Sequence, residues 1–421
     1  MLSTSLNVKV NRSRNRHFSS RPPSSSLRNL QLITISVLLC CGSFCDLAQA
    51  LQLKAVNRMA NSDKLYQVEQ LPSPLTKLGE GPVWDIDTQS LYYVDINTPA
   101  VLRYDYAENR TYSAKLDGAK SISFIVLVAG QPGEFVVGEN NRVSLIGWDG
   151  RSEQAKHVRV LADLGESQNH VRFNDGKVDP SGRLYAGTMQ LETLGDLFAQ
   201  KEGQLFRYTN GTMVVQKKNV SISNGLTWDE PHNPLRMYYI DSAALDVKAF
   251  DVDENGDLKN ETVFFDLRIN GSNPGYVPDG MTSDSEGNLY VATWGGSKLM
   301  NVDKGTRQLL REIKIPAEQV TSAAFGGPQL DELFVTTSSN GNKPAPAGAL
   351  FKVSGLGVKG KPISTLVPPY SGSSTFSPTF TARGTCSPVW VLRAPGPTAT
   401  TVPSSTFDCA FSGMTIPPFV L

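Results

Sequence analysis

One phrase recurs along this chain of 421 residues, and that recurrence constrains the fold more than any other feature. The phrase holds a polar residue beside Gly, an apolar or aromatic strand, a turn rich in Asp, Gly and Pro, and a second strand. Its copies begin at Gly79, Asn174, Ser223 and Pro278, with a degenerate copy at Thr321, and a segment that begins at Ser121 fills the double gap between the first two. Recurrence at a regular spacing indicates an array of similar structural units.

Six units spaced by roughly 40–55 residues are typical of propeller blades with four strands each. We therefore predict an all-β fold, a six-bladed β-propeller over residues 63–360 that follows a linker at 51–62. A β-sandwich is the competing all-β fold, but it does not explain why one phrase returns at the same phase.

The first 50 residues have the layout of a secretory signal peptide. Five Arg residues between positions 12 and 28 precede an apolar run over about 30–44, and Ala48-Gln49-Ala50 offers a cleavage site. A signal anchor and an organelle transit peptide remain as alternatives. At the other end, residues 361–421 are rich in Ser, Thr and Pro, which predicts a disordered tail. Cys386 and Cys409 in this tail would be able to pair after export.

Glycosylation sequons support a secreted glycoprotein. They begin at Asn109, Asn210, Asn219, Asn260 and Asn270. No Cys lies between residues 46 and 385, which is typical of a cytosolic ancestry, and a cytoplasmic location is the alternative if the leader is absent or unused. Residues 51–360 hold 31 Lys and Arg against 38 Asp and Glu, so nucleic acid is not expected as a partner. We expect a monomer without stable membrane insertion after signal removal.

Four of the recurring phrases carry a side-chain oxygen directly before their Gly: Glu80, Asp175, Asn224 and Asp279. Asx-Gly pairs are common in turns, and that explanation would suffice for any one of them. At the same phase of four blades, however, these side chains would converge on the axis of a propeller. Crowded carboxylates repel one another unless a cation neutralises them, and such oxygens suit Ca²⁺, Mg²⁺ or Mn²⁺. The pattern predicts a site for one divalent cation.

Several motifs make the chain resemble the family of regucalcin, senescence marker protein and gluconolactonase, including its insect anterior fat body and luciferin-regenerating branch. They are Glu80-Gly-Pro-Val-Trp, Arg172-Phe-Asn-Asp-Gly-Lys, Ser223-Asn-Gly-Leu-Thr-Trp and Pro278-Asp-Gly-Met. The resemblance implies a six-bladed propeller with one axial divalent cation (Ca, Zn, Mn or Mg), held by Glu80, Asn224 and Asp279. It also implies that Arg172, Asn174 and Glu192 bind the substrate and that Asp175 lies beside the metal.

The function expected from these residues is metal-dependent hydrolysis of a small sugar lactone, with Asp279 as general base. No Ser-His-Asp arrangement is visible in the sequence. A non-enzymatic calcium-binding regulator and a hydrolase of another small molecule, of the luciferin-regenerating type, remain as alternatives. Gln190 and Leu191 precede Glu192 where the family often has two consecutive acids, and this difference bears on the choice of substrate.

Overall fold

The structure is a computed structural model, and it describes residues 66–209 and 211–367. All of these residues belong to the unit Ala60–Leu421. They form β-strands joined by turns, and the helical segments among them are the three short 3₁₀ turns η1 (Glu166–Gln168), η2 (Glu192–Leu194) and η3 (Ser242–Ala244). The all-β class predicted from the sequence is confirmed for this part of the chain.

The strands pair with their sequence neighbours in antiparallel runs of four, and further pairings join four of the six runs two by two into eight-stranded sheets. The first run contains β2 (Gly79–Asp85), β3 (Ser90–Asp95), β4 (Ala100–Asp105) and β5 (Arg110–Leu116). The second run contains β6 (Ile122–Leu127), β7 (Glu134–Glu139), β8 (Arg142–Gly147) and β9 (Gln154–Asp163). The third run contains β10 (Val171–Val178), β11 (Leu184–Gln190), β12 (Gly203–Thr209) and β13 (Thr212–Val220).

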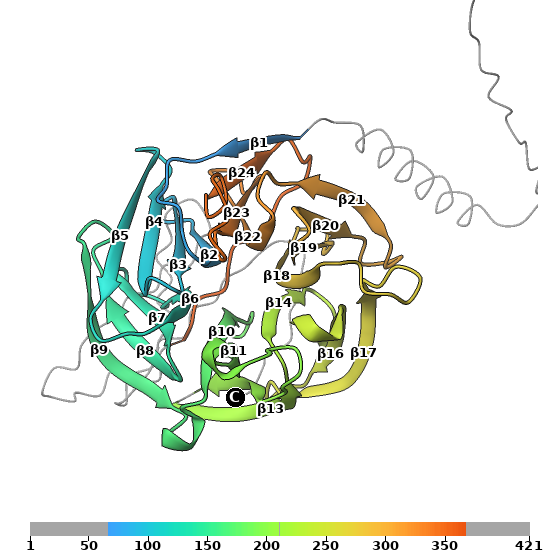
Figure 1. Ribbon diagram of the computed structural model, residues 1–421, viewed down its shortest axis with the longest axis horizontal. Coiled ribbons are helices and arrows are strands. Elements are labelled where there is room, and N and C mark those ends of the chain that lie inside the picture. Colours follow the sequence, from blue (N-terminus) through green and yellow to red (C-terminus); the bar gives the residue numbers. More distant parts are fainter. Residues whose placement is uncertain (1–65, 210, 368–421) are drawn as a thin grey trace, which may run out of the picture. The chain divides into compact units, whose positions relative to one another are not determined.

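Three more runs follow along the chain. One contains β14 (Ser223–Asp229), β15 (Leu235–Asp241), β16 (Asp246–Val252) and β17 (Leu258–Asp266). Another contains β18 (Val277–Ser283), β19 (Leu289–Trp294), β20 (Lys298–Val302) and β21 (Leu309–Lys314). The last contains β22 (Gln319–Gly326), β23 (Glu332–Ser338) and β24 (Phe351–Ser354), and β1 (Gln67–Gln70) from the start of the described chain pairs with β24. In Figure 1 the first strand of each run lies near a common centre and the outermost strand lies at the rim.

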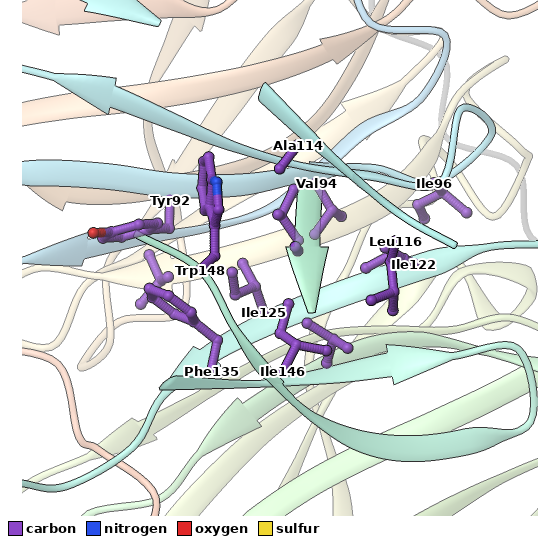
Figure 2. Packing of buried hydrophobic residues seen from close by; sticks show 14 of the residues in the cluster. Tyr92, Val94, Ile96, Ala114, Leu116, Ile122, Ile125, Phe135, Ile146 and Trp148 are labelled. Carbon is purple, nitrogen blue, oxygen red and sulfur yellow. The ribbon is translucent and has the colours of Figure 1, made fainter. Parts of the chain in front are cut away.

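Apolar side chains pack between neighbouring runs. Figure 2 shows one such cluster, in which Val94 and Leu116 from the first run meet Ile122, Phe135 and Ile146 from the second. Strands such as Ser90–Asp95 are buried along their whole length because both of their faces are covered by other parts of the fold. Full burial on both faces explains why these strands read as continuous apolar runs rather than as an alternating pattern.

The recurring Gly allows the first strands to lie close together at the centre. A Cβ atom at Gly225 of β14 would lie 2.7 Å from Met281 Cβ and 2.8 Å from the carbonyl oxygen of Asp279, both on β18. A Cβ atom at Gly280 would lie 2.1 Å from the hydroxyl of Ser322 on β22. Real Cβ atoms do not approach other atoms so closely, so only Gly fits at these two positions.

Several sequence-based predictions lie outside the described residues: the signal peptide at 1–50, the linker at 51–62, the sequon at Asn210, the Cys386–Cys409 pair and the tail beyond Val367. The first residues of the expected tail are described. Leu366 is buried, its N–H donates to the carbonyl of Leu127, and its own carbonyl accepts the N–H of Ala129. Within the described residues, no helix has the length and apolar character to span a membrane.

Candidate metal and substrate site

A cavity of about 150 Å³ brings together six residues that the sequence singles out. Its lining includes Glu80, Arg172, Asn174, Glu192, Asn224 and Asp279. Glu80, Asn174, Asn224 and Asp279 lie on the first strands β2, β10, β14 and β18, so residues 199 positions apart in the chain meet near the centre. All four are at most 7% exposed.

β-bulges occur next to these side chains. The register of β14 with β15 shifts between Ser223 and Leu226, and that of β18 with β19 shifts between Pro278 and Met281. The same irregularity lies between Phe173 and Gly176 in β10 and between Glu80 and Val83 in β2. A bulge leaves residues unpaired and re-aims their side chains, so a bulge at the same phase of several runs directs their polar residues to one place.

The electrostatics of Glu80 and Asp279 are those of crowded, buried carboxylates. Burial raises the pKa of Glu80 well above its usual range, the charges of Asp279 and Asp175 raise it further, and the Gly81 N–H and Arg172 oppose these effects. Burial and the charge of Asp175 likewise raise the pKa of Asp279, against hydrogen bonds with Asn224 and Glu80. A cation between two carboxylates held this way would strongly stabilise their ionised forms.

Asn224 supplies an uncoordinated oxygen at the same place. Its Nδ2 donates to the hydroxyl of Ser242 over 3.0 Å, whereas its Oδ1 is buried without a hydrogen-bond partner. A buried oxygen without a hydrogen-bond partner lowers the stability of the fold unless an ion or a water molecule binds it. Among the described residues no three His, Cys, Asp or Glu side chains form a metal cluster, and the expected set differs from such a cluster because its third ligand is an amide. Two carboxylates and one amide oxygen fit a hard divalent cation.

Asn174 lines the cavity together with Arg172 and Glu192, whereas Asp175 does not line it but lies close enough for its charge to raise the pKa of Glu80 and Asp279. Asp175 precedes the Gly, as Asn224 and Asp279 do, but Asn174 is the one that lines the cavity of Glu80 and Asn224. Asp175 lines a separate cavity of about 110 Å³ together with Lys177. The bulge in β10 contains both residues, and side chains adjacent in a strand point in opposite directions. Sequence spacing alone does not reveal which of them faces the cavity.

Arg172 and Glu192 form a hydrogen-bonded pair at the edge of the cavity. Arg172 Nε and Nη2 donate to Glu192 Oε1 over 3.0 and 2.5 Å, and Arg172 Nη1 donates to Asn174 Oδ1 over 2.7 Å. Asn174 Nδ2 in turn donates to the carbonyl of Ser223 over 2.8 Å. Burial raises the pKa of Glu192, but the charge and hydrogen bonds of Arg172 outweigh it and the net pKa is lowered. Glu192 is therefore an ionised acceptor at the mouth.

The remaining lining was not anticipated from the sequence. It includes the hydroxyl of Ser242, which orients Asn224, and large apolar side chains. Asn340 is a further polar residue of the lining. The apolar side chains are Leu78, Met189, Leu197, Phe198, Ile222, Val277 and Trp294. They come from strand ends and from the loop between β11 and β12, where no recurring phrase marks them. The cavity thus has oxygen ligands for a cation, an ionised acceptor in Glu192 and an apolar wall.

Comparison with known proteins gives matches over the same part of the chain. A family model described as "SMP-30/Gluconolactonase/LRE-like region" matches residues 78–339. Regucalcin of Danio rerio is 36% identical over 313 residues, which cover 72% of this chain and 98% of that protein. Human regucalcin is 34% identical over 303 residues, which cover 70% of this chain and 94% of that protein.

Solved structures agree with these matches. A luciferin-regenerating enzyme superposes with a TM-score of 0.67 at 33% identity, covering 72% of this chain and 100% of that one. A gluconolactonase from Xanthomonas campestris superposes with a TM-score of 0.54, covering 70% of this chain and 92% of that one. Its identity of 20% supports a shared fold and no more.

Proposed function

The chain belongs to the SMP-30/gluconolactonase/LRE-like family, and from this premise we propose that it is a lactonase that depends on one divalent cation. The observation that carries the proposal is the cavity in which two buried carboxylates, Glu80 and Asp279, lie with the unpartnered oxygen of Asn224. We propose further that the runs of four strands are the six blades of a propeller, with this cavity on its axis. The arrangement of first strands around a common centre supports that architecture.

In this proposal Glu80, Asn224 and Asp279 hold the cation. When bound, the cation would polarise the lactone carbonyl and balance the charge that develops on its oxygen. Sugar lactones are the substrate class implied by the family, and the bonded set of Arg172, Asn174 and Glu192 would position one at the cavity mouth. Because Arg172 Nε and Nη2 are fixed by Glu192, the guanidinium holds a single orientation when substrate arrives.

Asp279 has the role of general base. It removes a proton from a water molecule as the water oxygen bonds to the carbonyl carbon of the lactone. The bond between that carbon and the ring oxygen then breaks, and the ring oxygen takes the proton back to give a hydroxy acid. Burial and the neighbouring charge of Asp175 raise the pKa of Asp279 in the metal-free site, and a bound cation would oppose this rise.

The proposal is tested by following acid release from D-glucono-δ-lactone, above the spontaneous rate, with the full-length protein and added Mn²⁺, Zn²⁺, Mg²⁺ or Ca²⁺. We expect hydrolysis that one or more of these ions restores after chelation. Asp279→Ala should lower kcat by about 100-fold or more, the usual effect of losing a general base. Asp266→Ala, at an exposed carboxylate on β17 outside the cavity lining, is the matched control and should keep the rate.

Tight Ca²⁺ binding without hydrolysis of any lactone would instead support the calcium-binding regulator. Full activity of Asp279→Ala would rule out the proposed base. If the chelated protein hydrolyses the lactone as fast as the loaded protein, the dependence on a cation is wrong.

A further inference from the structure

The wall of the cavity is unusually apolar for a site that would bind a polyhydroxylated ring. Leu197, Phe198 and Trp294 line it beside the buried carboxylates. Phe198 is 49% exposed even though it contacts the cavity, and Leu194 in the same loop is 56% exposed. Large apolar side chains exposed together at a cavity mouth indicate a surface that becomes covered when a ligand binds.

Most hydrogen-bond donors at the cavity are already in use, and the exceptions include Asn340 Nδ2 and the hydroxyl of Ser242, which could serve one or two substrate hydroxyls. Arg172 Nε and Nη2 donate to Glu192, and Arg172 Nη1 donates to Asn174 Oδ1 and to the carbonyl of Phe173. Asn174 Nδ2 donates to the carbonyl of Ser223, and Asn224 Nδ2 donates to Ser242. The lactone of an aldonic acid carries a hydroxyl on nearly every carbon, and each hydroxyl oxygen buried without a donor is unfavourable.

These two observations lead to one inference about the substrate. We propose that the preferred substrate is a lactone that carries an alkyl or aryl substituent and at most one or two hydroxyls. The substituent lies against Phe198, Leu197 and Trp294, the carbonyl lies toward Glu80 and Asp279, and one hydroxyl donates to the free lone pairs of Glu192. This inference rests on the proposed lactonase function and specifies its substrate class.

The test compares δ-valerolactone, δ-hexalactone and δ-octalactone, which differ only in the length of an alkyl substituent, with D-glucono-δ-lactone. The readouts are kcat/KM with the metal-loaded full-length protein and calorimetric binding of the matching δ-lactams, which cannot be hydrolysed readily. We expect kcat/KM and lactam affinity to rise at least tenfold from the unsubstituted to the propyl-substituted ring. δ-Octalactone should also exceed D-glucono-δ-lactone in kcat/KM by tenfold or more.

Variants locate the effect at the apolar wall. Phe198→Ser should lower the ratio of kcat/KM for δ-octalactone to that for δ-valerolactone at least fivefold. Val158→Ser is the control, because Val158 is 50% exposed and lies outside the cavity lining, and it should leave the ratio unchanged.

The outcomes separate this inference from the function on which it rests. Hydrolysis that is fastest for D-glucono-δ-lactone and does not respond to the alkyl chain or to Phe198→Ser overturns the substrate class while the lactonase function stands. No hydrolysis of any lactone with any of the four cations overturns the function, and the inference with it.

Discussion

Asn224 is the residue whose surroundings point most directly to a bound cation. A buried amide usually has hydrogen-bond partners at both of its ends, yet Asn224 lines the cavity with Nδ2 bonded to Ser242 and with Oδ1 buried and without a partner. Its two neighbours in the proposed ligand set, Glu80 and Asp279, carry raised pKa values because they are buried and close to other acids. Without a cation, the site therefore lowers the stability of the folded protein, and a bound cation would restore that stability.

The raised pKa values of these two carboxyls predict how stability depends on pH. A carboxyl with a raised folded pKa binds more protons in the native state than in the unfolded state, between the unfolded pKa of about 4 and its folded pKa. Its contribution to the free energy of unfolding therefore falls as pH rises through that window. Asp279→Asn removes one such group, so in EDTA the variant should melt higher than the wild type at pH 7, by about 2–4 °C.

The measurement is thermal unfolding of the wild type and of Asp279→Asn in EDTA from pH 4 to pH 8. The difference in Tm between variant and wild type should grow with pH. With saturating Ca²⁺ the order should reverse, because only the wild type binds the ion. A difference that is independent of pH would contradict the assignment of a raised pKa to Asp279.

The polar residues beside Gly could be predicted from the sequence in part only. The polar residue beside Gly was recognisable in four phrases, and three of those residues, Glu80, Asn224 and Asp279, do share one cavity. In the fourth phrase the residue in that cavity is Asn174, while Asp175 faces the other one. The choice depends on how the bulge in β10 turns two adjacent side chains, and a bulge has no reliable sequence signal.

At the scale of the element, the first strands β14 and β18 must lie against each other for the site to form. Gly225 provides that approach, because any Cβ atom there would overlap the backbone of Asp279 and the side chain of Met281. The strand pattern and the turns of each run were predictable from β-branched and aromatic residues bounded by Gly, Pro and Asp. The contact between strands of different runs could not be predicted, because no local sequence pattern encodes it.

Gly225→Ala should push β14 away from β18 and act on stability and on the site together. We expect a loss of about 1–3 kcal/mol in the free energy of unfolding, as for overpacked interiors, and a weaker Ca²⁺ affinity. Gly147→Ala in β8 is the matched control, because a Cβ atom there would lie 3.7 Å from Val158 Cγ2 and 4.0 Å from the carbonyl oxygen of Gly133, which are ordinary contacts. Chemical denaturation and calorimetric Ca²⁺ titration measure both effects. Equal behaviour of the two variants would contradict the close-approach role of Gly225.

At the scale of the whole molecule, the recurring phrases did not predict strand β1, which lies before the first of them. The recurring phrases begin at Gly79, but Gln67–Gln70 pairs with Phe351–Ser354 and completes the last run of strands. Thr76 supports this closure, since its hydroxyl lies 3.0 Å from the carbonyl of Thr337 and 2.9 Å from that of Gly348. A strand of four residues whose pairing partners lie 281 to 287 positions away could not be identified from local sequence.

Export of the chain is a prediction that also belongs to the whole molecule. The sequon residues Asn109, Asn219, Asn260 and Asn270 are all exposed, and none lines the cavity. Asn109, Asn219 and Asn260 belong to or adjoin the outer strands β5, β13 and β17, at the rim in Figure 1, and Asn270 lies in the connection between β17 and β18.

Expressed with its own leader in a eukaryotic secretory host, the protein should therefore reach the medium as a glycoprotein. Enzymatic removal of N-glycans should lower its mass, and Thr262→Ala should remove the glycan from Asn260 alone. A cytosolic protein whose mass equals that of the whole polypeptide would contradict both secretion and glycosylation.

The central claim is that side chains from distant parts of the chain hold one divalent cation at the centre of the strand arrangement. Anomalous X-ray scattering from crystals soaked in Mn²⁺ tests it most directly. The account predicts a strong anomalous peak within bonding distance of the oxygens of Glu80, Asn224 and Asp279, and no such peak in crystals of Asp279→Asn. No peak between these three side chains in the wild type, at a Mn²⁺ concentration that supports hydrolysis, would contradict it.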